Sequence, residues 1–194
     1  MKNILLSGAP SVGKSSVIEQ LEKKVPQSQR IVTYDQARWY MQAQNLRADT
    51  MTRQQKEEMQ RFVIATYIGA LKHCTHSHIM GILDGSLIEA INYSTGVVPD
   101  NLTLACERYL SKYKDHSIAY IIPPTIPLVD DGLRHTDATF REEMHEKIVQ
   151  TIVKHKIPYY KLLLISGDFY WPFDKVNHYH CSPVPVLRRL ISWG

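Results

Sequence analysis

Short apolar runs alternate along the chain with longer segments in which apolar residues recur every three or four positions. The runs are typical of strands buried on both faces of a parallel sheet, and the longer segments are typical of amphipathic helices. Strands are predicted at residues 4–6, 30–35, 78–84, 118–122 and 160–166. Helices are predicted at residues 14–25, 36–45, 52–74, 86–93, 99–110, 136–155 and 186–192. This alternation predicts an α/β fold, a five-stranded parallel sheet with helices on both faces.

The segment between the first strand and the first helix reads GAPSVGKS, from Gly8 to Ser15. This is the G-x-x-x-x-G-K-S pattern of a phosphate-binding P-loop, in the strand–loop–helix context that the pattern requires. Its glycines allow a tight turn, and successive N–H groups form an anion-binding nest at the start of the helix. Lys14 supplies a positive charge for the β- and γ-phosphates, and the Ser15 hydroxyl is placed for Mg²⁺. The pattern therefore predicts that the chain binds ATP together with Mg²⁺.

Composition places bounds on the class of protein. The 194 residues fit a single domain, residues 1–194, and a hydrophobic fraction of 44% is enough for a core. No apolar run reaches the length of about eighteen residues that spans a membrane, so no membrane partner is expected. The cysteines are scattered and odd in number, which predicts free thiols in a reducing cytoplasm. If the protein is viral, this would be the cytoplasm of the host cell. The net charge of +4 is compatible with anionic substrates, and a homodimer is as compatible with the sequence as a monomer.

Polar residues follow the ends of the predicted strands. Asp35 and Asp84 come at the ends of the second and third strands, and Asp168 follows the fifth. Arg134 lies in a polar loop after the fourth strand, at about residues 123–136, which is expected to act as a lid. Because ligands bind at the carboxyl ends of parallel strands, these residues are expected to converge on one edge of the sheet.

In their order along the chain, these segments resemble the P-loop kinases of the nucleoside and nucleotide kinase-like type, in particular the nicotinamide riboside kinase-like ATPase family. Besides the P-loop, the resemblance rests on residues 35–38, 84–86, 93–94, 123–134 and 167–168, which are distributed over most of the chain in the expected order. It implies transfer of the γ-phosphoryl group of ATP to a hydroxyl of a nucleoside-like or nucleotide-like acceptor. Two arginines common in the family are missing, since Gly85 follows Asp84 and aromatic residues follow Asp168.

The P-loop chemistry and the resemblance together assign the candidate site residues. Those expected to bind the nucleotide are Gly8, Ala9, Pro10, Ser11, Val12, Gly13, Lys14, Ser15, Ser16 and Asp168. Those expected to bind the acceptor are Asp35, Arg38, Gln60, Asp84 and Tyr93. Ser15 and Asp84 are expected to hold Mg²⁺, and the residues expected to be catalytic are Lys14, Asp35 and Arg134.

Several of the assignments outside the P-loop have a simpler structural alternative. Asp35 and Asp84 are each placed where a carboxylate would cap the following helix. Arg38 lies one helical turn from Asp35, so it could pair with that carboxylate instead of a substrate phosphate. Arg134 could be a solvated loop charge, and Gln60 could serve at the edge of the core, as could Tyr93.

Two other functions fit the same sequence. Kinases that phosphorylate 5-hydroxymethyluracil bases in viral DNA resemble this group too, and the aromatic residues 169–173 would suit a flipped base. Strong, salt-dependent affinity for DNA would favour that function. A regulatory ATPase is the second alternative, and hydrolysis that no acceptor stimulates would favour it.

Overall fold

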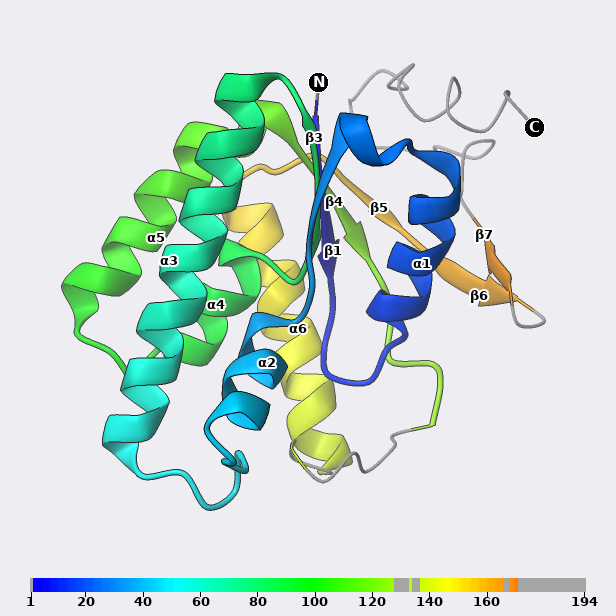
Figure 1. The fold of residues 1–194 in the computed structure, drawn as a ribbon. Helices are drawn as coiled ribbons and strands as arrows, with labels where there is room; N and C mark the ends of the chain where they lie inside the picture. Colours follow the sequence, from blue (N-terminus) through cyan, green and yellow to red (C-terminus); the bar gives the residue numbers. More distant parts are fainter. Residues whose placement is uncertain (1, 128–132, 134–136, 166–167, 171–194) are drawn as a thin grey trace.

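A computed structural model describes residues 2–127, 133, 137–165 and 168–170 (Figure 1). Its central sheet has five parallel strands in the order β2-β3-β1-β4-β5. They are β1 (Asn3–Ser7), β2 (Arg30–Thr33), β3 (Met80–Asp84), β4 (Ser117–Ile121) and β5 (Tyr159–Lys161). The central strand β1 places Leu5 opposite Leu83 of β3 and Ala119 of β4. The predicted α/β fold with a parallel five-stranded sheet is confirmed.

Helices cover both faces of this sheet, but unequally (Figure 1). One face packs against α1 (Lys14–Lys24). The other packs against α3 (Arg53–Ser77), α4 (Leu87–Ser94), α5 (Asp100–Tyr113) and α6 (Ala138–Lys154), with α2 (Gln36–Ala43) beside them. None of the helices in the described part of the chain is both long enough and apolar enough to cross a membrane.

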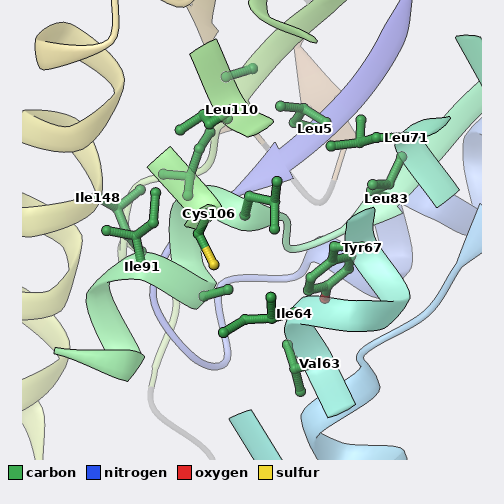
Figure 2. Close-up of a cluster of buried hydrophobic side chains, with 14 of the residues drawn as sticks. Leu5, Val63, Ile64, Tyr67, Leu71, Leu83, Ile91, Cys106, Leu110 and Ile148 are labelled. Atoms are coloured by element: carbon green, nitrogen blue, oxygen red, sulfur yellow. The ribbon is translucent and has the colours of Figure 1, made fainter. Parts of the chain in front are cut away.

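Side chains of β1 alternate between the two faces. Ile4 and Leu6 join the cluster under α1, whereas Leu5 joins the larger cluster under the other helices. Figure 2 shows part of this larger cluster, which contains Leu5 of β1, Leu71 of α3, Leu110 of α5 and Ile148 of α6. The sheet therefore has an apolar layer on each face, as its continuous apolar strands predict.

The helix predicted at residues 52–74 continues to Ser77, so its predicted end was wrong. Thr52 and Gln55 form a capping box at its start, as expected for a helix N-terminus. At its other end His78 takes a left-handed conformation, and the N–H groups of His78 and Ile79 both donate to the carbonyl of Cys74. The last helical turn is polar and lacks the apolar spacing on which the prediction depended, so β3 begins at Met80 instead of His78.

The strand predicted at residues 160–166 is divided in two. After β5, the N–H of Leu162 donates to the carbonyl of Ile121, and the chain then leaves the parallel sheet. Residues Leu163–Ile165 form β6, which pairs antiparallel with β7 (Asp168–Tyr170). A continuous apolar run does not show where a strand changes partner, so the sequence pattern concealed this division. The predicted helix at residues 186–192 lies outside the described residues.

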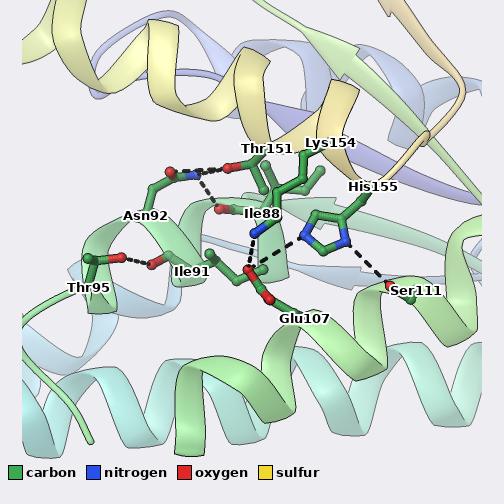
Figure 3. A network of polar contacts seen from close by, with 9 residues as sticks. All are labelled: Ile88, Ile91, Asn92, Thr95, Glu107, Ser111, Thr151, Lys154 and His155. Atoms are coloured by element: carbon green, nitrogen blue, oxygen red, sulfur yellow. Dashed lines mark hydrogen bonds and ion pairs between the residues drawn. The ribbon is translucent and has the colours of Figure 1, made fainter. Parts of the chain in front are cut away.

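A polar network joins α6 to α4 and α5 (Figure 3). The amide nitrogen of Asn92 donates to the hydroxyl of Thr151 at 3.0 Å, and the ammonium of Lys154 donates to Glu107 at 2.7 Å. The ring of His155 lies 3.8 Å from the same Glu107 carboxylate. These contacts hold the carboxyl-terminal half of α6, and the amino-terminal half of the same helix reaches the P-loop.

Candidate functional site

The P-loop connects β1 to α1, and its backbone explains both glycines. A Cβ at position 8 would lie 2.7 Å from the carbonyl oxygen of Ile122, so only glycine fits there. Gly13 has a left-handed φ of 90° at the start of α1. The ammonium of Lys14 donates to the carbonyls of Gly8 at 2.9 Å and Ala9 at 3.0 Å. The lysine is therefore folded over its own loop, within reach of a phosphate that would replace these carbonyls.

Ser15 and Asp84 come together at the ends of α1 and β3. The Ser15 hydroxyl donates to Asp84 Oδ2 at 3.1 Å, and Asp84 is only 3% exposed. A hydroxyl and a carboxylate oxygen are the kinds of ligand that Mg²⁺ prefers, so this pair fits a magnesium site. Asp84 does not cap α4, because the cap is Ser86, whose hydroxyl accepts the N–H of Ile88.

Tyr67 of α3 ties the strand of Asp84 to the helix that follows Asp35. Its hydroxyl donates to the backbone carbonyl of Asp84 at 2.5 Å and accepts the backbone N–H of Gln36. Burial, with the nearby charges of Asp35 and Asp84, raises the pKa of Tyr67 well above its usual value, so the hydroxyl keeps its proton. One hydroxyl thus contacts the backbone at Asp84 and at Gln36, the residue after Asp35.

Gly85 stands where the resemblance places an arginine. Its φ is +76°, and a Cβ there would lie 2.8 Å from the Tyr67 hydroxyl. A longer residue at this position is excluded unless Tyr67 moves. The Tyr67 hydroxyl thus occupies the space that the Cβ of an arginine at this position would need.

Asp35 caps α2 and also lines a cavity. Its Oδ1 accepts a hydrogen bond from the backbone N–H of Arg38 at 3.0 Å. Asp35 is therefore a helix cap, as its simpler structural alternative predicts. The cap does not exclude a role at the cavity, because Asp35 also lines that cavity. Arg38 contributes its backbone to this cap and is not one of the described residues that line the cavity.

A cavity of about 390 Å³ opens beside the P-loop, between α2, α3, α4 and α6. This volume is within the usual range for small-molecule sites. The charged residues that line it are Lys14, Asp35, Lys56, Asp84, Glu89 and Lys147. Its apolar lining includes Met41, Met51, Met59, Val63, Phe140 and Met144. The predicted acceptor residues Gln60 and Tyr93 also line it, so residues that are far apart in the sequence share one cavity.

Sequence reasoning missed Glu89 of α4, which is 7% exposed. Its Oε1 accepts the backbone N–H of Gly8 at 3.0 Å, and its Oε2 accepts the Ser86 hydroxyl at 2.9 Å. Burial raises the pKa of Glu89, and the charge of Lys14 opposes that rise. A signal was present, because Glu89 interrupts an apolar segment with buried neighbours on both sides. A charge in such a segment indicates a buried, paired group.

Sequence reasoning also missed Arg141 of α6, which is 6% exposed. Its guanidinium donates to the carbonyls of Pro10 at 3.1 Å, Ser11 at 3.0 Å and Ile126 at 2.8 Å. Ser11 has a left-handed φ of 56°, which is uncommon for serine, and Arg141 holds its carbonyl. The signal was the spacing, since Arg141 lies three residues before Met144 on the apolar face of its helix.

The side chains of two predicted residues lie outside the described part of the chain. Arg134 lies outside the described residues, as does most of the predicted lid loop. Asp168 begins β7, but the described part of the chain does not include its side chain. Their roles stay predictions.

Comparison with known proteins agrees with this geometry. Residues 3–169 match the model of a family described as an AAA domain. The chain belongs to this family. No curated protein sequence matches it. The family assignment and the phosphate site therefore agree on a P-loop domain.

Solved structures of low sequence identity share the fold of this AAA domain. NadR protein in complex with NR has a TM-score of 0.60 and 17% identity, over 99% of this chain and 51% of that chain. NadR with NAD and AMP-PNP has a TM-score of 0.56 and 17% identity, over 86% and 45%. The chain thus spans about half the length of the NadR chains. Thymidylate kinase from Ehrlichia chaffeensis has a TM-score of 0.54 and 13% identity, over 99% and 97%. These similarities show a P-loop kinase fold.

Proposed function

We propose that the chain is a kinase that transfers the γ-phosphoryl group of ATP to a hydroxyl of a nucleoside-like or nucleotide-like acceptor. The observation that supports this proposal is the shared cavity, in which Lys14 of the P-loop and the carboxylates of Asp35 and Asp84 line one space. A phosphoryl group bound at the P-loop would face this space. An ATPase without an acceptor would not require a small-molecule cavity there.

In this proposal the P-loop binds the phosphates of ATP with its backbone N–H groups and the start of α1. Lys14 exchanges the carbonyls of Gly8 and Ala9 for phosphate oxygens. Ser15 and Asp84 would hold Mg²⁺, which neutralises charge on the β- and γ-phosphates when it is bound. Arg141 keeps the outer carbonyls of the loop fixed, so the loop does not have to reorganise when the phosphates arrive.

The acceptor would occupy the cavity with its hydroxyl toward the P-loop. Asp35 would orient that hydroxyl and accept its proton as transfer proceeds. Gln60 is 6% exposed, and its side chain accepts a hydrogen bond from the Ser94 hydroxyl at 3.3 Å, which fixes the amide that would contact the acceptor. Tyr93 and the methionines would cover the apolar part of the acceptor, for which flexible methionine side chains are well suited. Arg134 of the lid loop would then cover the transferring phosphoryl group, and Asp168 would contact the nucleotide.

Transfer of labelled phosphate from γ-labelled ATP tests the proposal directly. The acceptor panel begins with NR and thymidylate, because similar structures are NadR with NR and thymidylate kinase. It continues with other nucleosides, nucleotides and DNA that contains 5-hydroxymethyluracil. We expect label on at least one acceptor, and Lys14→Ala should reduce that transfer at least about 10²-fold by removing a charge from the phosphate site.

Lys24→Ala is the matched control, since Lys24 is exposed at the far end of the same helix. It removes the same charge and should leave transfer unchanged. Hydrolysis of ATP that no acceptor stimulates would contradict the kinase proposal and favour a regulatory ATPase. Transfer to DNA alone would replace the small acceptor with a DNA base.

A further inference from the structure

Gly8, the first glycine of the P-loop, is held from two sides by charged side chains. The ammonium of Lys14 donates to the Gly8 carbonyl, and Glu89 accepts a hydrogen bond from the Gly8 N–H. The proposed function gives the two contacts different roles when a nucleotide binds. The proposed function requires Lys14 to leave the carbonyl for phosphate, whereas nothing in it requires Glu89 to release the N–H.

Glu89 is itself fixed by the start of its own helix. Its second oxygen accepts the hydroxyl of Ser86, and the same hydroxyl accepts the N–H of Ile88. The helix cap, the carboxylate and the P-loop glycine thus form one continuous chain of hydrogen bonds. The bond to Gly8 joins residues 81 positions apart in the sequence, and it attaches the loop to α4.

We propose that Glu89 is a positioning residue of the nucleotide site, which holds the Gly8 end of the P-loop while Lys14 moves to phosphate. This inference rests on the proposed binding of a nucleotide, but not on the identity of the acceptor. Because both carboxylate oxygens of Glu89 already accept hydrogen bonds from protein groups, its role is to hold the loop. Asp35 remains the residue proposed to act on the acceptor hydroxyl.

What the site needs from Glu89 is an acceptor oxygen. A negative charge beside the phosphates opposes their binding, so the charge itself gives no advantage there. A glutamine has the same shape and keeps one oxygen for the Gly8 N–H. An alanine leaves that buried N–H without its acceptor, and an unsatisfied buried donor is costly.

Titration with a fluorescent N-methylanthraniloyl derivative of ATP, in the presence of Mg²⁺, tests the inference on the full chain. We expect Glu89→Ala to raise the Kd about tenfold, which corresponds to one unsatisfied buried group. Glu89→Gln should stay within about twofold of the wild type, since it keeps the acceptor oxygen. Glu142→Ala is the matched control, because Glu142 is exposed on α6, and it should have no effect. Thermal unfolding of each variant shows which ones are folded.

A second measurement uses the wild type alone. The chain has nine glycines, so ¹⁵N-glycine labelling gives few enough signals to assign the Gly8 amide. Its exchange with solvent should stay slow both without nucleotide and with the ATP derivative bound. Rapid exchange of this amide in the bound state would overturn the inference even if the alanine variant does not fold.

The outcomes separate this inference from the proposed function. A wild type that does not bind the derivative would contradict nucleotide binding itself. Wild-type binding with an unchanged Kd for Glu89→Ala would overturn the positioning role alone. A glutamine variant that binds as weakly as the alanine variant would also overturn it, because the charge would then be the essential property.

Discussion

The apolar cluster shown in Figure 2 and the P-loop edge of the sheet are both buried, yet they are stabilised in different ways. In the cluster, Leu5, Leu83 and Leu110 are at most 1% exposed and contribute contacts that have no direction. At the edge, Glu89 and Arg141 are nearly as buried, but each forms hydrogen bonds with particular backbone atoms of the P-loop. Glu89 accepts from the Gly8 N–H, and Arg141 donates to the carbonyls of Pro10 and Ser11. The stability of the cluster depends on how well side chains fill its volume, whereas the P-loop edge depends on individual hydrogen bonds. Substitutions in the cluster should therefore change stability, and substitutions at the edge should change nucleotide binding.

The largest expected effect on stability is in the cluster. Leu110→Ala should lower the free energy of unfolding by about 2–5 kcal/mol, because it removes buried methyl groups and leaves a cavity. Urea denaturation measures this change. Leu104→Ala is the matched control, since Leu104 lies on the same helix and is 51% exposed. It should change the free energy of unfolding by less than about 0.5 kcal/mol.

The nucleotide affinity of the folded Leu110→Ala protein should equal that of the wild type. If its Kd for the fluorescent ATP derivative rose in step with the loss of stability, the cluster and the edge would not be separable. The comparison between them would then fail.

Arg141→Lys should have an intermediate effect, and it should act on binding. Lysine keeps the positive charge but lacks the planar fork that reaches three carbonyls. We expect a Kd about tenfold higher, as the outer part of the P-loop loses its support. Arg108→Lys, at an exposed position of α5, should leave the Kd unchanged. An unchanged Kd for Arg141→Lys would show that charge alone supports the loop.

The smallest expected effect concerns the pH dependence of stability at Glu89. Burial raises the pKa of Glu89 above its usual value of 4.5. Between that value and the raised pKa, the folded chain holds a proton that the unfolded chain has released. The free energy of unfolding of the wild type therefore falls as the pH rises through this window. Glu89→Gln has no such proton, so its stability relative to the wild type should increase across the same window and then stay constant.

Thermal unfolding of the two proteins in parallel, from pH 4.5 upward, measures this difference. Other titrating groups are common to both proteins and cancel. A difference that does not change with pH would mean that Glu89 ionises in the folded chain as it does in the unfolded one. Ionisation of the buried Glu89 would then not lower the free energy of unfolding. A functional site that is retained at the expense of stability is expected to lower it.

Most of the architecture could be predicted from the sequence, because it depends on local signals. The five strands and the helices between them follow from the spacing of apolar residues, and the P-loop follows from its residue pattern. The errors occurred where the local signal is absent. The last turn of α3 is polar, and the apolar run after residue 159 does not show that β6 leaves the parallel sheet.

The residues of the candidate site can also be separated into those with a local sequence signal and those without one. The sequence determined by itself which loop should bind phosphate and which acids follow the strands, because neighbours along the chain carry those signals. Only the tertiary structure decided that Glu89 and Arg141 hold that loop, since their contacts join residues 81 and about 130 positions apart. No periodicity within one helix specifies such a pairing. It arises when the sheet brings α4 and α6 against the P-loop, where each buried polar group requires a partner.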